Sequence, residues 1–159
     1  MHPGTVPDAA PNLIGMASVS TYLNFMGDTF AAFEFYRDVF GTEYRGPVLR
    51  NRDVPGMPDT MSEADLDGIM HVELPILGGH VLMATDMLES MGHELRIGNN
   101  VTINLEPDTR EETERLFARL SEGSTEMAPL TEQFWGYWGV CLDRFGVRWM
   151  FNGPAATAS

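Results

Sequence analysis

Residues 134–152 read FWGYWGVCLDRFGVRWMFN, and this aromatic stretch is the most distinctive segment of the chain. It contains all three tryptophans of the protein, and glycines are spaced between the aromatic residues. Branched and aromatic residues favour β-strands, so we expect strands over 137–143 and 147–152, joined by a turn at Arg144-Phe145-Gly146. These aromatic side chains either fill a hydrophobic core or line a binding site.

The alternation of side chains along a strand divides this segment between two surfaces. On the first strand we expect Trp138, Val140 and Leu142 to face the core. On the second strand Trp149 and Phe151 share a face, so packing against a helix explains at least half of the aromatic residues.

Two aromatic residues of the segment remain for a second surface. Trp135 and Tyr137 could line a ligand cavity, or they could lie at a seam between two subunits.

The elements preceding this segment form the same pattern twice. Strand-like residues 19–25 are followed by a helix that begins after Asp28 and ends at Gly41. We expect a strand over 42–50, a loop over 51–67, and a hairpin of residues 69–77 and 80–85 around Gly78-Gly79.

The second copy of the pattern starts with a strand at 101–105. Thr109 and Glu112 have the spacing of a helix capping box, and Gly123 ends this helix. Glu111 and Arg115 have the spacing of a favourable ion pair on the helix surface. A strand over 126–134 leads into the aromatic stretch.

The order βαβββ followed by βαβββ is an internal repeat, and a repeat determines the fold class. We predict an α+β protein made of two βαβββ modules with curved mixed sheets. The predicted boundaries are a flexible arm at 1–16, a first module at 17–98 with an irregular connecting loop, a second module at 99–153, and a tail at 154–159.

Composition excludes several classes of partner. The formal net charge is −13, which repels nucleic acid and anionic membrane surfaces. No apolar run approaches the roughly 20 residues of a membrane helix, and no signal peptide is evident at the N-terminus. All the basic residues are arginine, so no lysine is present for Schiff-base chemistry. A single cysteine permits no disulfide within the chain, and we expect a cytoplasmic protein.

Three segments make the chain similar to a known family. They are YLNFMGD at 22–28, MHVELPILGGHVLMATD at 70–86 and TEQFWGYWGVCLDRFGVRWMFN at 131–152. Together with the duplicated topology, they resemble the PhnB-like family of the vicinal oxygen chelate superfamily, which includes glyoxalases, extradiol dioxygenases and bleomycin resistance proteins. The resemblance implies two half-barrels, a homodimer, and a site lined by alternate strand residues inside a barrel.

Metal-dependent relatives place one ligand on each of four strands. The resemblance puts these positions at Thr21, Met83, Thr102 and Met150. None of these residues is an imidazole or carboxylate ligand of the kind that zinc, nickel or iron prefers. We therefore predict no metal site and no cofactor.

The register of the first strand leaves an alternative open. If Leu23 and Phe25 face the core, Tyr22 and Asn24 point toward the cavity in place of Thr21. A shift of one residue exchanges the two faces of a strand.

His71 and Glu73 lie two residues apart on one face of the third strand, and two interpretations remain for them. They could form an acid–base couple or half of a metal site. Alternatively, they are the polar side of a half-buried strand, which is the interpretation we favour because such pairs are usually solvated. His80 and His93 are expected to be loop residues.

The predicted function is the binding of a small, partly apolar organic molecule. The expected ligand-binding residues are Thr21, Tyr22, Asn24, Met83, Thr102, Trp135, Tyr137 and Met150. Whether a reaction follows binding is left open, with His71 and Glu73 as catalytic candidates. The alternatives are a metal-dependent lyase or isomerase of the glyoxalase and dioxygenase type, and a drug-sequestering resistance protein.

Overall fold

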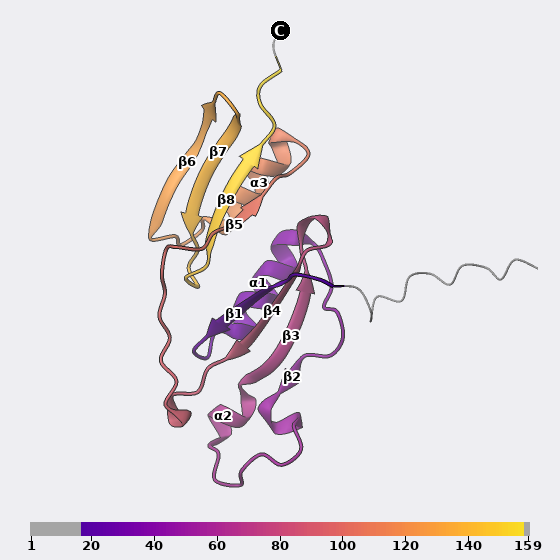
Figure 1. The fold of residues 1–159 in the computed structure, drawn as a ribbon, viewed down its shortest axis with the longest axis vertical. Helices are drawn as coiled ribbons and strands as arrows, with labels where there is room; N and C mark the ends of the chain where they lie inside the picture. Colours follow the sequence, from indigo (N-terminus) through magenta and orange to yellow (C-terminus); the bar gives the residue numbers. More distant parts are fainter. Residues whose placement is uncertain (1–16, 158–159) are drawn as a thin grey trace, which may run out of the picture.

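The computed structural model describes residues 17–157, so the predicted arm at 1–16 and the end of the tail lie outside the described residues. The first module consists of β1 (Thr21–Phe25), α1 (Thr29–Phe40), β2 (Leu49–Arg50), α2 (Glu63–Asp67), β3 (Ile69–Pro75) and β4 (Val81–Asp86). The second consists of β5 (Ile103–Leu105), α3 (Arg110–Leu120), β6 (Glu126–Gln133), β7 (Gly136–Leu142) and β8 (Arg148–Gly153). The predicted α+β repeat is confirmed (Figure 1).

Each module forms one four-stranded mixed sheet with the same topology. The strand orders are β1-β4-β3-β2 and β5-β8-β7-β6. The first and last strands of each module pair in parallel, and the remaining neighbours are antiparallel. Both sheets are open, so each corresponds to a half-barrel and not to a closed barrel.

Two segments of the first module differ from the sequence prediction. The strand expected over 42–50 is only Leu49–Arg50, because Gly46 has a positive φ of 78° and interrupts the extended chain. The loop expected over 51–67 contains a 3-10 helix at Asn51–Asp53 and the short helix α2. Ser62 caps α2 by accepting a hydrogen bond from the backbone N–H of Asp65 at 3.1 Å.

The two predicted long helices form, but only α1 ends where expected: α3 ends at Leu120 with Ser121 as its C-cap, and not at Gly123. Gly41 adopts the left-handed conformation that ends α1. Thr109 caps α3, and its hydroxyl accepts a hydrogen bond from the N–H of Glu112 at 3.1 Å. Arg115 pairs with the Glu112 carboxylate at 2.7 Å, whereas the sequence predicted Glu111 as its partner.

One hydrophobic cluster extends through both modules. Tyr36 and Phe40 of α1 contact the ring of Trp149 in β8, with centroids 5.5 Å and 5.8 Å away. Trp149 and Phe151 are fully buried, as their spacing predicted. The first module's helix therefore packs on the second module's sheet as well as on its own.

The prediction for the faces of β7 is wrong. Gly139 and Cys141 are buried against the helix side, whereas Trp138, Val140 and Leu142 are only half buried. The small side chains on the helix side leave room for the large Trp149 and Phe151 on the neighbouring strand, so residue size misled the assignment.

Candidate functional site

The candidate site lies on the face of the first sheet that α1 does not cover (Figure 1). Across this face, Tyr22 of β1 and Glu73 of β3 are both register partners of Met83 in the central strand β4. The residues on either side of Met83 in β4, Leu82 and Ala84, are fully buried on the helix side. Because side chains alternate along each strand, Tyr22, Met83 and Glu73 form one row on the uncovered face.

A hydrogen-bonded chain of four side chains crosses this face. The Tyr22 hydroxyl lies 3.1 Å from Nδ1 of His71, and Nε2 of His71 lies 3.0 Å from a carboxylate oxygen of Glu73. Arg45 donates from Nε to the other Glu73 oxygen at 2.6 Å. The Arg45 backbone N–H also donates to the Glu73 carbonyl at 2.9 Å. Glu73 is thus fixed from two sides.

The hydrogen-bond roles in this chain follow from the donor inventory. An ionised Glu73 can only accept, so Nε2 of His71 carries the hydrogen that faces it. In the neutral ring Nδ1 is then an acceptor, and the Tyr22 hydroxyl donates to it. The oxygen of Tyr22 keeps its lone pairs available to a ligand.

The surroundings of the chain shift the pKa of two of its members in opposite directions. The hydrogen bond from His71, with those from Arg45, lowers the pKa of Glu73. Partial burial and, to a smaller extent, the Glu73 charge raise the pKa of Tyr22. At neutral pH the chain therefore holds a carboxylate at one end and a protonated phenol at the other.

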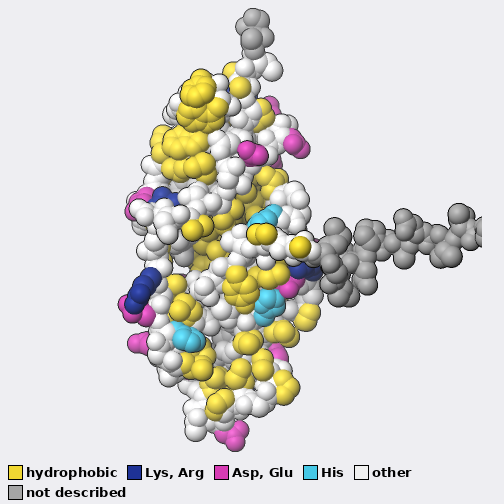
Figure 2. Space-filling view, in the orientation of Figure 1, with side chains coloured by type: hydrophobic (Ala, Val, Ile, Leu, Met, Phe, Trp, Pro, Cys, Tyr) yellow, Lys and Arg dark blue, Asp and Glu magenta, His cyan; other side chains and the backbone are white. Residues whose placement is uncertain are grey.

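A cavity of about 790 Å³ lies beside this chain, at the end of the sheet near α2. Five of its lining residues are methionines: Met57, Met61, Met70, Met87 and Met91. Asn24 and Thr85 from the uncovered face complete its wall on the side of the sheet. In the space-filling view, this side of the first module carries histidine and hydrophobic side chains with few charges (Figure 2).

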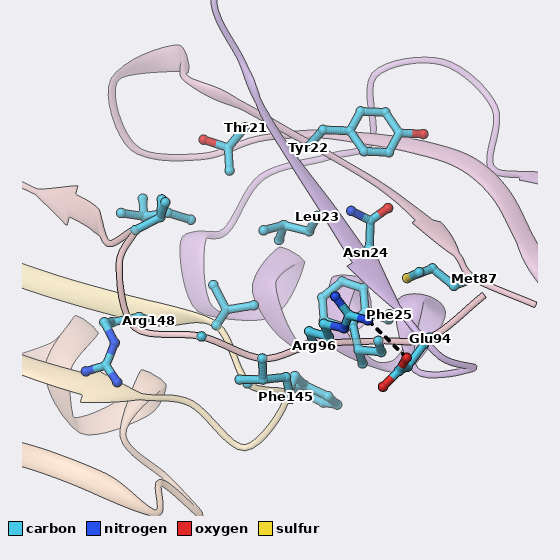
Figure 3. A pocket seen from close by; sticks show the side chains of 17 residues that line it. Thr21, Tyr22, Leu23, Asn24, Phe25, Met87, Glu94, Arg96, Phe145 and Arg148 are labelled. Atoms are coloured by element: carbon cyan, nitrogen blue, oxygen red, sulfur yellow. Dashed lines mark hydrogen bonds and ion pairs between the residues drawn. The ribbon is translucent and has the colours of Figure 1, made fainter.

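A second cavity of about 520 Å³ lies along the edge of β1, between the two modules. Figure 3 shows Tyr22 and Asn24 on one side of β1 and Thr21 and Leu23 on the other. Asn24 and Met87 line both cavities, so the two spaces meet at the end of β1.

The structure brings together only some of the residues predicted for the site. Tyr22, Asn24 and Met83 share the uncovered face, as the alternative register of the first strand predicted. Thr21 is the register partner of the buried Leu82 and therefore lies on the opposite face from Met83. Its hydroxyl lies 2.8 Å from Nε2 of His80.

The predicted residues of the second module lie apart from this chain. Met150 is the register partner of Asn104, and Thr102 precedes β5. Trp135 is 52% exposed and donates to Asn152 at 3.3 Å. Tyr137 lies under the Arg110 guanidinium, which is 3.9 Å from its ring centre. Neither aromatic residue lines the two cavities described above.

Two further side chains that were considered as catalytic groups are engaged in a hydrogen bond or buried away from solvent. His93 lines the methionine cavity, and its Nδ1 accepts a hydrogen bond from the N–H of Leu88 at 3.0 Å. Cys141 is fully buried, and burial together with the Asp143 charge raises the pKa of its thiol to about 12. A thiol of this kind is not a nucleophile at neutral pH.

Comparison with solved structures identifies a relative of this chain. The chain is 32% identical to the protein PA1353 from Pseudomonas aeruginosa, and its crystal structure matches with a TM-score of 0.76 over 89% of this chain and 100% of that chain. The chain belongs to the same family as PA1353.

More distant structures share the fold. The PhnB protein from Bacillus cereus is 20% identical, with a TM-score of 0.68 over 86% of this chain and 99% of that chain. The fosfomycin resistance protein FosX from Listeria monocytogenes is 13% identical, with a TM-score of 0.58 over 86% of this chain and 91% of that chain. The PhnB-like, vicinal oxygen chelate fold predicted from the sequence is therefore confirmed. No protein-family model and no curated protein matches the chain.

Sequence reasoning missed Arg45 and the methionine cavity. Arg45 lies in the segment expected to be a strand, and nothing in its spacing points to Glu73, which is far along the chain. The methionines were detectable, because six of the protein's 11 fall between positions 57 and 91.

Within residues 17–157, no helix is long and apolar enough to cross a membrane.

Proposed function

We propose that this protein binds a small, partly apolar organic molecule on the uncovered face of its first sheet. The observation that carries the proposal is the cavity of about 790 Å³ lined by five methionines. Its volume lies within the range of small-molecule sites. Methionine side chains are flexible and polarisable, so they suit aromatic or irregular apolar groups.

Polar groups at the edge of the cavity would orient the ligand. Asn24 and Thr85 offer hydrogen bonds beside the apolar wall, and the Tyr22–His71–Glu73–Arg45 chain adjoins them on the same face. The carboxylates among the lining residues are Asp65 and Asp86. Asp86 accepts hydrogen bonds from Gly27, Thr29 and Ile69, which leaves it saturated. A neutral ligand fits this lining best.

We propose that binding does not depend on a first-row metal. FosX has been solved with manganese(II). In this chain the corresponding positions carry hydroxyl and thioether groups, and Thr21 and Met83 point to opposite faces of the sheet. Within residues 17–157, no cluster of three or more histidine, cysteine or acidic side chains could hold a metal ion. These donors do not fit zinc, manganese or iron.

We also propose that the protein assembles as a homodimer.

Binding of the neutral dye Nile red tests the proposal through its fluorescence. We expect saturable binding, and Met70→Gln should weaken it about tenfold, because an amide replaces apolar contact area worth roughly 1.4 kcal/mol. Met127→Gln is the matched control, since Met127 is an exposed strand methionine in the second module, outside the cavity. Equal weakening by both substitutions, or no saturable binding, would refute the proposal.

A further inference from the structure

We propose that Tyr22, His71 and Glu73 form a proton relay that takes an acidic C–H proton from a small carbonyl compound bound on the uncovered face. This inference rests on the proposed binding function and adds a reaction to it. Hydrogen bonds of 3.1 and 3.0 Å connect the three side chains of the relay, and a third of 2.6 Å joins Glu73 to Arg45.

Each member of the relay has a defined role. Tyr22 is the catalytic residue, because its hydroxyl oxygen is the end of the chain that a ligand can contact. Its side chain lines the cavity along β1, and the residue is 47% exposed. His71 and Glu73 are positioning residues that act through Tyr22. Arg45 anchors Glu73 and neutralises its charge when the relay is at rest.

The site can hold both the acidic hydrogen and the carbonyl oxygen of the same molecule. Asn24 is exposed two residues beyond Tyr22 on the same side of β1 (Figure 3). Alternate residues on one face of a strand are about 7 Å apart. A carbonyl oxygen that accepts a hydrogen bond from the Asn24 amide would place its molecule on the same side of β1 as the Tyr22 side chain, as the relay requires. The apolar remainder of the molecule would extend into the methionine cavity.

The proton transfer balances within these groups. The C–H bond breaks and its electron pair forms the enolate, whose oxygen is bound by the Asn24 amide. The proton goes to the Tyr22 oxygen while the phenolic proton passes to Nδ1 of His71, and the imidazolium faces the Glu73 carboxylate. Returning the proton to a different carbon completes an isomerisation, which requires no oxidant or reductant.

The experiment uses the full chain and the probe 5-nitrobenzisoxazole. Its ring opens when a base removes the C3 proton: the C–H electron pair forms the nitrile, the N–O bond breaks, and its oxygen becomes the coloured phenolate of the same molecule. We expect saturable, protein-dependent ring opening that falls about 100-fold in Tyr22→Phe, the scale of general-base catalysis. His80→Gln removes a histidine outside the relay and should leave the rate unchanged.

The pH–rate profile separates the relay from a structural role. The ionisable groups around His71 are Tyr22 from β1, Glu73 on β3 itself and Arg45 before β2. In Glu73→Gln the acid limb of the profile should move to lower pH, because the carboxylate no longer stabilises the imidazolium. A change of rate without this movement would overturn the positioning role.

Nile red binding, measured on the same samples, separates the two proposals. Saturable dye binding without ring opening, or ring opening that survives in Tyr22→Phe, would overturn the relay while the binding function stands. Absence of dye binding would overturn the binding function on which the relay depends.

Discussion

At the scale of single residues, a buried carboxylate joins the two modules. The two oxygens of Asp143 accept four hydrogen bonds. One comes from the Tyr36 hydroxyl at 2.6 Å, one from the indole N–H of Trp149 at 2.8 Å, and two from the backbone N–H groups of Phe145 and Val147 at 2.8 and 2.9 Å. Burial and this carboxylate raise the pKa of Tyr36 well above its ordinary value. The Tyr36 phenol therefore remains a donor at any physiological pH.

Asp143→Asn should destabilise the fold by about 2–4 kcal/mol, because in either orientation the amide nitrogen places a donor against at least one N–H group that can only donate. Urea unfolding followed by tryptophan fluorescence measures the loss. Asp59→Asn is the matched control, since it makes the same chemical change at a residue that is exposed in a loop. Equal stability of the two variants would contradict the anchoring role of Asp143.

At the scale of elements, α3 is determined by its cap and by the strand beneath it. Thr113 and Leu116 are fully buried on one side of this helix. Gly153 of β8 lies so close that a Cβ atom there would collide with the Thr113 hydroxyl. The absence of a side chain at Gly153 thus allows the helix to rest directly on its sheet.

Thr109→Ala should reduce the free energy of unfolding by about 1 kcal/mol, because the N–H of Glu112 loses its side-chain acceptor. Thr109→Ser should retain nearly all of the stability, since its hydroxyl can occupy the same position. Thermal unfolding followed by circular dichroism compares the three proteins. A serine variant as unstable as the alanine variant would show that the methyl group, and not the cap, matters.

At the scale of the whole molecule, the two modules depend on each other. The Asp143–Tyr36 bond, the rings of Phe40 and Trp149, and an ion pair between Arg119 and Asp38 at 2.6 Å all cross between modules. Arg115 also donates to the Val39 carbonyl at 3.0 Å. A module separated from its partner would expose a large part of this shared core.

We therefore expect one cooperative unfolding transition. All three tryptophans lie in the second module, so their fluorescence reports on that half, whereas far-ultraviolet circular dichroism reports on both. In urea the two signals should give the same midpoint. Separate midpoints would show that the modules unfold independently, contrary to the shared core.

The sequence by itself determined the fold and its internal repeat. Alternating strand residues, the end of α1 at Gly41, and the spacing of residues 134–152 are local patterns, and each follows from backbone geometry over a few residues. The sequence also allowed Tyr22 and Asn24 to be placed on the same face of β1, because side chains alternate along a strand and Leu23 and Phe25 were assigned to the core.

Only the tertiary structure decided which residues meet. The meeting of Tyr22 with His71, and of Glu73 with Arg45, depends on strand pairing between distant segments, which local periodicity does not encode. The faces of β7 were misassigned for a related reason. Trp138 is larger than Cys141, but the space between sheet and helix was already occupied by Trp149 and Phe151. Packing volume is shared among neighbouring strands, so only the assembled core determines which side chain is buried.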